Sequence, residues 1–156
     1  MGHYFLESSA LVKRYKQEPG TNIIDRLFDE SDAEWFYLNL AEIEIRKVFY
    51  RLWKYPQAGE QSAQISEADF LALQAAFTHD LGQMRRIELT DSMIEHAVTV
   101  LEKVWLKSVF DLAHLAAYLV MKEEYEDLIF VCSDQLSNLV DGARAFVAES
   151  SIVIPQ

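Results

Sequence analysis

Two acidic residues follow short apolar runs that are typical of β-strands. Glu7 comes directly after residues 3–6 (HYFL), and Asp134 follows residues 128–132 (LIFVC) across a single serine. In an open parallel sheet, ligands bind beyond the carboxyl ends of the strands, near the point where the strand order reverses. The sequence therefore predicts that these two carboxylates lie at one edge of a sheet.

Two further acids, Glu44 and Asp111, lie in stretches with helical spacing that are otherwise dominated by apolar residues. An ionised carboxylate that is buried alone is very costly, and four that converge without matching arginines repel one another. A divalent cation removes this conflict, and oxygen ligands suit Mg²⁺ or Mn²⁺ better than zinc. We therefore expect a metal site formed by four acids: Glu7, Glu44, Asp111 and Asp134.

Some of these positions have alternative interpretations. Glu42 competes with Glu44, and because the two are two residues apart on a helix they face nearly opposite ways. Asp134 could simply cap a helix that follows the strand. His114 lies three residues after Asp111 on the same helix face, which suggests a metal pair. A histidine within LAHLAAYL is, however, more often a packed core residue with one hydrogen bond.

The elements that must position these acids alternate along the chain. Apolar runs predict strands at 3–6, 35–38, 87–89, 128–132 and 152–154, and apolar spacing predicts helices at 10–17, 21–30, 40–53, 66–81, 90–104, 111–121 and 134–147. Residues 55–65 form a polar loop, and Ser66 with Asp69 resembles a capping box. Strands that are apolar on both faces and alternate with helices indicate an α/β three-layer sandwich with a mainly parallel central sheet. The length of 156 residues predicts a single domain over 1–156.

Composition limits the possible partners and location. The net charge of −11 works against indiscriminate binding of polyanions and favours a basic partner or bound cations. A local basic patch could still hold a nucleic acid. The single Cys132 fits a reducing compartment, and no apolar run reaches the length of a membrane span. Because the start of the chain also lacks signal-peptide organisation, we expect a soluble, cytoplasmic protein with no membrane contact.

Four segments in order resemble the PIN domain family, and within it the small VapC-like ribonucleases. YFLESSALVKRYKQEPG is similar to the opening of the family, although the first acid there is normally Asp rather than Glu7. Glu44 is followed by Arg51 at the family's spacing, which favours Glu44 over Glu42. LKSVFDLAHLA looks like the motif of the third acid, Asp111, and FVCSD resembles the end of the strand before the fourth acid, Asp134.

This resemblance covers nearly the whole chain and implies a PIN-like fold and an activity. The chain would be a metal-dependent endoribonuclease that hydrolyses RNA phosphodiester bonds, the toxin of a type II toxin–antitoxin pair. The catalytic acids carried over by position are Glu7, Glu44, Asp111 and Asp134, which would hold Mg²⁺ or Mn²⁺. Ser9 would support the first acid by hydrogen bonding. The implied partners are RNA, an antitoxin protein and a second copy of the chain in a homodimer.

Basic residues on two expected helices are candidates for contacts with the RNA backbone: Lys13, Arg14, Arg46, Lys47 and Arg51. Such contacts would make binding strongly salt-dependent. The alternative is that these side chains form ordinary solvated helix faces, and part of the Arg46 and Lys47 pair could bind nearby acids.

Glu7 also supports a second hypothesis, a catalytically impaired PIN-fold module that binds RNA or a protein. Glutamate extends the carboxylate by one methylene, while Mg²⁺ demands near-octahedral geometry at about 2.0–2.1 Å. A phosphatase-like α/β enzyme is a third and weaker alternative, because it would need a nucleophilic Asp where Glu7 lies.

Overall fold

The central element is a five-stranded sheet in which every strand pair is parallel. The computed structural model describes residues 2–60, 62–133 and 138–156. The strands are β1 (His3–Leu6), β2 (Glu34–Leu38), β3 (Arg85–Ile87), β4 (Ile129–Val131) and β5 (Ile152–Val153), in the order β3-β2-β1-β4-β5. The chain moves outward from β1 to β3 and then returns to the other side of β1. The strand order therefore reverses between β1 and β4, where a ligand site is expected.

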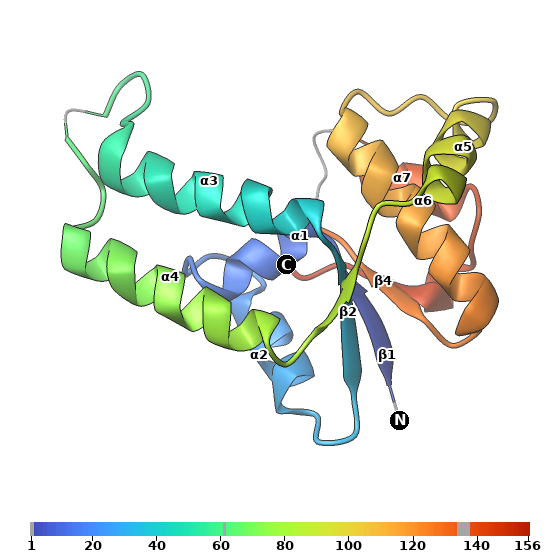
Figure 1. Cartoon of the computed structure of the whole chain (residues 1–156), viewed down its shortest axis with the longest axis horizontal. Helices are drawn as coiled ribbons and strands as arrows, with labels where there is room; N and C mark the ends of the chain where they lie inside the picture. Colours follow the sequence, from blue (N-terminus) through green and yellow to red (C-terminus); the bar gives the residue numbers. More distant parts are fainter. Residues whose placement is uncertain (1, 61, 134–137) are drawn as a thin grey trace.

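Helices cover both faces of the sheet (Figure 1). One face carries α1 (Ser8–Leu11), α2 (Thr21–Asp29), α3 (Leu40–Lys54) and α4 (Glu67–Leu81), and the other carries α5 (Asp91–Val100), α6 (Val109–Glu124) and α7 (Leu139–Arg144). Two short 3₁₀ turns, η1 (Val12–Arg14) and η2 (Glu149–Ser151), complete the described elements. This arrangement confirms the three-layer α/β fold.

The strands contribute alternate side chains to two separate hydrophobic cores. Phe5 and Phe130 pack with the core under α5, α6 and α7, whereas Leu6 and Val131 pack with the core under α1 to α4. Successive side chains of a strand point to opposite faces, so a continuous apolar run fills both cores. All four residues are fully buried.

Helices α3 and α4 lie side by side and extend beyond the sheet in Figure 1. Aromatic rings join them: Trp53 stacks on Phe70 with ring centroids 4.3 Å apart, and Phe49 meets Phe77 edge-on. Helix α4 begins with the expected capping box, in which Ser66 and Asp69 satisfy each other's backbone N–H groups. The apolar spacing that predicts a helix over 40–53 includes Ile43 and implies that it is covered, but Ile43 is 63% exposed.

Several element boundaries differ from the sequence expectation. The first helix begins at Ser8 rather than residue 10, because the Glu7 side chain caps it. Strand β3 lies at Arg85–Ile87 rather than 87–89, because pairing with β2 fixes its register. Helix α5 ends at Val100 instead of residue 104, and α7 covers only Leu139–Arg144. Among the described residues, no helix is long and apolar enough to cross a membrane.

Candidate active site

Glu7 lies at the carboxyl end of β1, where it forms the N-cap of α1. Its Oε2 accepts a hydrogen bond from the backbone N–H of Ser9 at 2.9 Å and a second from the Ser9 hydroxyl. The Glu7 residue is only 1% exposed. Both donors of Ser9 therefore hold one oxygen of a buried carboxylate at the edge of the sheet.

Ser9 also links the first acid to the end of β4. Its hydroxyl oxygen accepts a hydrogen bond from the backbone N–H of Ser133 at 3.0 Å. The backbone N–H of Glu7 donates to the carbonyl of Val131 at 3.0 Å. These two bonds lie across the β1–β4 boundary, so the first acid is fixed at the point where the strand order reverses.

Glu44 reaches the same place from helix α3. Its Oε1 accepts a hydrogen bond from the Ser8 hydroxyl at 2.9 Å and lies 2.5 Å from Nε2 of His114. Glu42 faces elsewhere and binds Arg86 at 2.8 Å. The two glutamates therefore point to different partners, as expected for residues two positions apart on a helix, and Glu44 is the one that lines the pocket.

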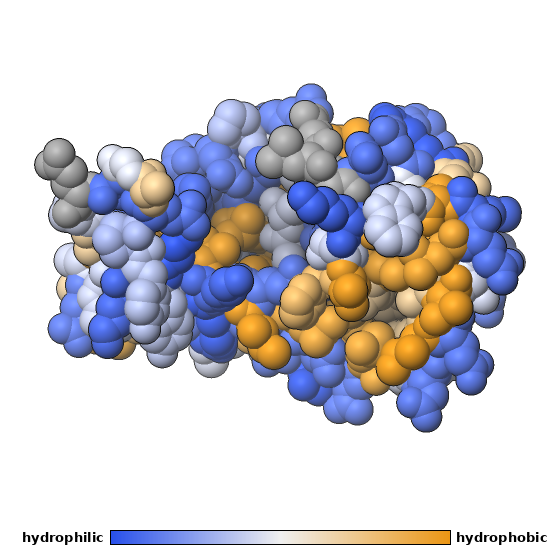
Figure 2. Space-filling view, turned by 90° about the horizontal axis from the view of Figure 1, so that it is seen from above, coloured by the Kyte–Doolittle hydropathy of each residue, from blue (hydrophilic) through white to orange (hydrophobic). Residues whose placement is uncertain are grey.

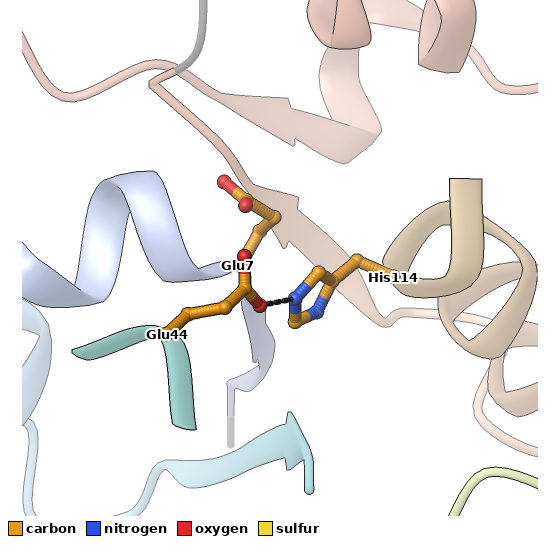
Figure 3. A group of neighbouring side chains, drawn as sticks. All are labelled: Glu7, Glu44 and His114. Atoms are coloured by element: carbon orange, nitrogen blue, oxygen red, sulfur yellow. Dashed lines mark hydrogen bonds and ion pairs between the residues drawn. The ribbon is translucent and has the colours of Figure 1, made fainter. Parts of the chain in front are cut away.

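His114 is a member of this cluster that the sequence analysis treated as a packed core residue. Its side chain is fully buried, as expected, but Nε2 also lies 3.2 Å from the Ser8 hydroxyl. Figure 3 shows that Glu7, Glu44 and His114 converge from three different elements, with the His114 ring directed at the Glu44 carboxylate. The feature of the sequence that indicated a role for His114 in the site was its position three residues after Asp111, on the same face of α6.

Asp111 lies in the first turn of α6 and is 6% exposed. Its backbone N–H donates to the Ser108 hydroxyl that caps this helix, at 3.4 Å. A pocket of about 500 Å³ is lined by the three carboxylates of Glu7, Glu44 and Asp111, together with Ser8 and Ser9. The fourth predicted acid, Asp134, lies outside the described residues.

The electrostatics of the pocket favour retention of protons. Burial raises the pKa of Glu7 to about 7, and the charge of Asp111 acts in the same direction, while His114 and Ser9 oppose it. Burial alone would lower the pKa of His114, but the hydrogen bond to Glu44 and the charge of Glu7 raise it overall. Burial thus favours the protonated form of Glu7, and the neighbouring carboxylates favour the charged form of His114.

The donor set fits a divalent cation. One ligand atom each from Glu7, Glu44 and His114 lie within 4.8 Å of one another. In the part of the chain that the structure describes, neither Glu7 nor Glu44 forms an ion pair with a lysine or arginine. Carboxylate oxygens are ligands that Mg²⁺ and Mn²⁺ accept, and a cation would relieve the repulsion among the acids.

Two of the predicted RNA-binding residues lie in η1 and contact other groups of the protein. Arg14 donates to Asp80 at 2.7 Å and to Asp25 at 3.0 Å. Lys13 donates to the backbone carbonyl of Pro19 at 2.7 Å. These contacts tie both side chains to the protein itself.

The three predicted basic residues of α3 are placed differently. Arg46 binds Gln74 and Thr78 on α4, and Arg51 lies 3.5 Å from Glu60. Lys47 is exposed and lines the acidic pocket. Of these three basic residues, Lys47 is the one that lies in the pocket with the acids.

No family model and no curated protein matches this chain, but solved structures do. The chain is similar to VapC20 of Mycobacterium tuberculosis, a Sarcin-Ricin loop cleaving toxin, with 14% identity, a TM-score of 0.61 and coverage of 94% of this chain and 97% of that one. A toxin–antitoxin complex from Klebsiella pneumoniae matches with 10% identity, a TM-score of 0.59 and 98% coverage of both chains. DNA-bound VapBC from Salmonella typhimurium matches with 13% identity, a TM-score of 0.58 and coverage of 99% and 97%. The chain therefore has the PIN-domain, VapC-like fold.

Proposed function

We propose that this chain is a metal-dependent endoribonuclease and the toxin of a type II toxin–antitoxin pair. The observation that carries the proposal is the pocket lined by Glu7, Glu44 and Asp111 at the edge where the strand order reverses. The VapC-like fold supports the same conclusion, because the solved neighbours include a Sarcin-Ricin loop cleaving toxin.

The acids of the pocket would hold Mg²⁺ or Mn²⁺. When bound, such a cation lowers the pKa of a coordinated water and offsets the charge that develops on the phosphate. Glu7 and Glu44 provide carboxylates that Ser9 and Ser8 hold in place. Asp111 provides a third from the start of α6, and Asp134 is proposed as a fourth.

Lys47 is the residue that we propose to bind the RNA backbone beside these acids. Its position in the pocket lining would bring an ammonium group to a phosphate that the carboxylates alone would repel. Lys13, Arg14, Arg46 and Arg51 remain weaker candidates, because each contacts other groups of the protein.

An antitoxin is the proposed protein partner. Three of the solved neighbours are toxin–antitoxin or VapBC assemblies. In Figure 2, apolar side chains gather over the half of the visible face that carries α5 and α6. Six large apolar residues of α5, α6 and the segment between them are exposed: Ile94, Val98, Leu101, Trp105, Val109 and Phe110. Large exposed apolar areas mark interaction surfaces, and the net charge of −11 favours a basic partner. We also expect a homodimer that packs through the early helices.

The direct test is cleavage of RNA by the purified protein with added Mn²⁺. Wild type should cleave, and Asp111→Asn should reduce the rate at least about 100-fold, because it removes a charged group from the pocket. Asp32→Asn is the matched control, since Asp32 is an exposed acid away from the pocket. Equal rates for wild type and Asp111→Asn would reject the proposed site.

The geometry of Glu7 supports one alternative, a PIN-fold binding module with impaired catalysis. Its Oε2 already accepts both donors of Ser9, so one oxygen of the carboxylate is occupied. This alternative predicts that wild type does not cleave with either metal and that Glu7→Asp restores cleavage. A wild-type protein that cleaves RNA in an Asp111-dependent manner would reject it.

A further inference from the structure

We infer that His114 is a positioning residue that fixes the carboxylate of Glu44 for cation binding. The inference rests on the proposed cation site and adds to it a residue beyond the four acids. Nε2 of His114 lies 2.5 Å from Oε1 of Glu44, although the two residues are 70 positions apart in the chain. The contact joins α6 on one face of the sheet to α3 on the other.

Two groups converge on the same oxygen of Glu44. The Ser8 hydroxyl donates to Oε1 at 2.9 Å, and His114 Nε2 approaches that atom from α6. Ser8 and His114 are themselves buried, with exposures of 6% and 0%. In the described part of the chain, the hydrogen bonds of the Glu44 carboxylate all involve Oε1, so Oε2 is the oxygen left for a cation.

The surroundings of the imidazole ring fix which nitrogen is the donor. Nδ1 of His114 is buried and has no hydrogen-bond partner among the described residues. A proton on Nε2 faces the oxygens of Glu44 and Ser8 in both the neutral and the charged form of the ring, whereas in the neutral form a proton on Nδ1 would be a buried donor without an acceptor. His114 thus donates from Nε2, and this role differs from direct ligation, which would need that nitrogen's lone pair.

Glu44 needs such support because its side chain is long and partly exposed. The side chain is 25% exposed, while the His114 side chain is fully buried. An untethered glutamate loses rotamer freedom when it binds a cation, and this loss weakens affinity. Partners that orient a metal ligand typically contribute about 10–100-fold in metal affinity or activity. His114 would orient the Glu44 carboxylate before the cation binds and so contribute to the affinity.

The test is a titration of the full-length protein with Mn²⁺ alone. Electron paramagnetic resonance of free Mn²⁺ and calorimetry measure the affinity. We expect His114→Leu to weaken the affinity about 10–100-fold, because the donor to Glu44 is removed. His114→Gln should keep the affinity within about threefold of wild type, because its amide N–H can donate to the same oxygen. Tyr118→Phe is the control for α6, since it removes a buried hydrogen bond to Leu128 away from the pocket.

A double-mutant cycle separates positioning from general damage to the fold. In the Glu44→Ala background, His114→Leu should weaken Mn²⁺ binding no further, because the group it positions is absent. Unchanged affinity in His114→Leu alone, or an additive loss in the Glu44→Ala background, would overturn the inference. A strong magnetic coupling between bound Mn²⁺ and a ¹⁴N nucleus would also overturn the inference if this coupling is lost in His114→Gln, because it would show that the imidazole ring is a ligand.

This experiment distinguishes the inference from the proposed function because it uses no RNA. A protein that binds Mn²⁺ through a His114-supported Glu44 but never cleaves RNA would keep the inference and reject the nuclease. Conversely, Asp111-dependent cleavage with equal Mn²⁺ affinities in wild type and His114→Leu would reject the inference alone.

Discussion

The backbone N–H of Ser133 donates a hydrogen bond to the hydroxyl of Ser9 at 3.0 Å, although 124 residues separate them. The same hydroxyl donates to Glu7. Ser9 therefore connects the end of β4 to the carboxylate that follows β1. This side chain adds to the backbone hydrogen bonds that already join β1 to β4 beside the pocket.

Ser9→Ala should destabilise the protein by about 1–2 kcal/mol, because it leaves the Ser133 N–H without an acceptor and removes a donor from buried Glu7. Urea unfolding measures this change. Ser62→Ala is the control, since Ser62 is exposed in the loop before α4. Equal midpoints for the two variants would contradict the proposed link.

The metal-free protein should lose stability as the pH rises toward neutrality. Folding raises the pKa of Glu7 from its ordinary value of 4.5 to about 7 through burial, so the folded state binds a proton that the unfolded state releases in this range. The stabilisation is fully present below about 4.5 and is lost as the pH rises through about 7.

Urea unfolding in the presence of a chelator, at several values between about pH 5 and 8, measures this slope. Glu7→Gln should flatten it, because the amide does not titrate. Glu124→Gln, at an exposed position, should leave the slope unchanged. A slope that is identical in Glu7→Gln and wild type would assign the effect to other groups.

Asp80→Asn should destabilise the fold by about 2 kcal/mol, because it removes the charge that binds Arg14 in a half-buried setting. Asp80 is 5% exposed and accepts from Arg14 and Tyr15, each at 2.7 Å. Thermal and urea unfolding provide the measurement. Asp141→Asn, which alters an exposed ion pair with Arg144, should have little effect.

A further variant, Arg14→Ala, tests whether Arg14 acts through the fold or through RNA. If its contacts with Asp80 are mainly structural, RNA affinity measured on folded Arg14→Ala protein should stay close to that of wild type. A large loss of RNA affinity in that variant would return Arg14 to the RNA-binding surface that the sequence predicted.

Lys47→Ala should weaken RNA binding and lower the salt dependence of the affinity by about one unit of slope. Lys47 lines the acidic pocket, whereas Arg51 on the same helix pairs with Glu60. Arg51→Ala removes an equal charge and should change the slope less. Filter binding of a short RNA over a range of salt concentrations makes the comparison, and a larger effect in Arg51→Ala would refute it.

Local sequence patterns were sufficient to predict most of the framework. Apolar runs identified strands that are covered on both faces, and the structure confirms their parallel arrangement. The turn of a helix predicted that only one of Glu42 and Glu44 would face the pocket, and the spacing to Arg51 in the resemblance favoured Glu44. Boundaries such as the end of α5 and the position of β3 were wrong, because pairing and packing between elements decide them.

The sequence by itself determined the fold class and the position of Glu7 directly after the first strand, since period and residue type are local properties of the chain. Only the tertiary structure decided which partners each of these side chains contacts. In the structure, His114, which the sequence pattern places in the core, contacts Glu44. Arg46 binds α4, whereas Lys47 lines the pocket. The physical reason is that partners such as Glu44 and His114 come from helices on opposite faces of the sheet, and a spacing within one helix carries no information about the other.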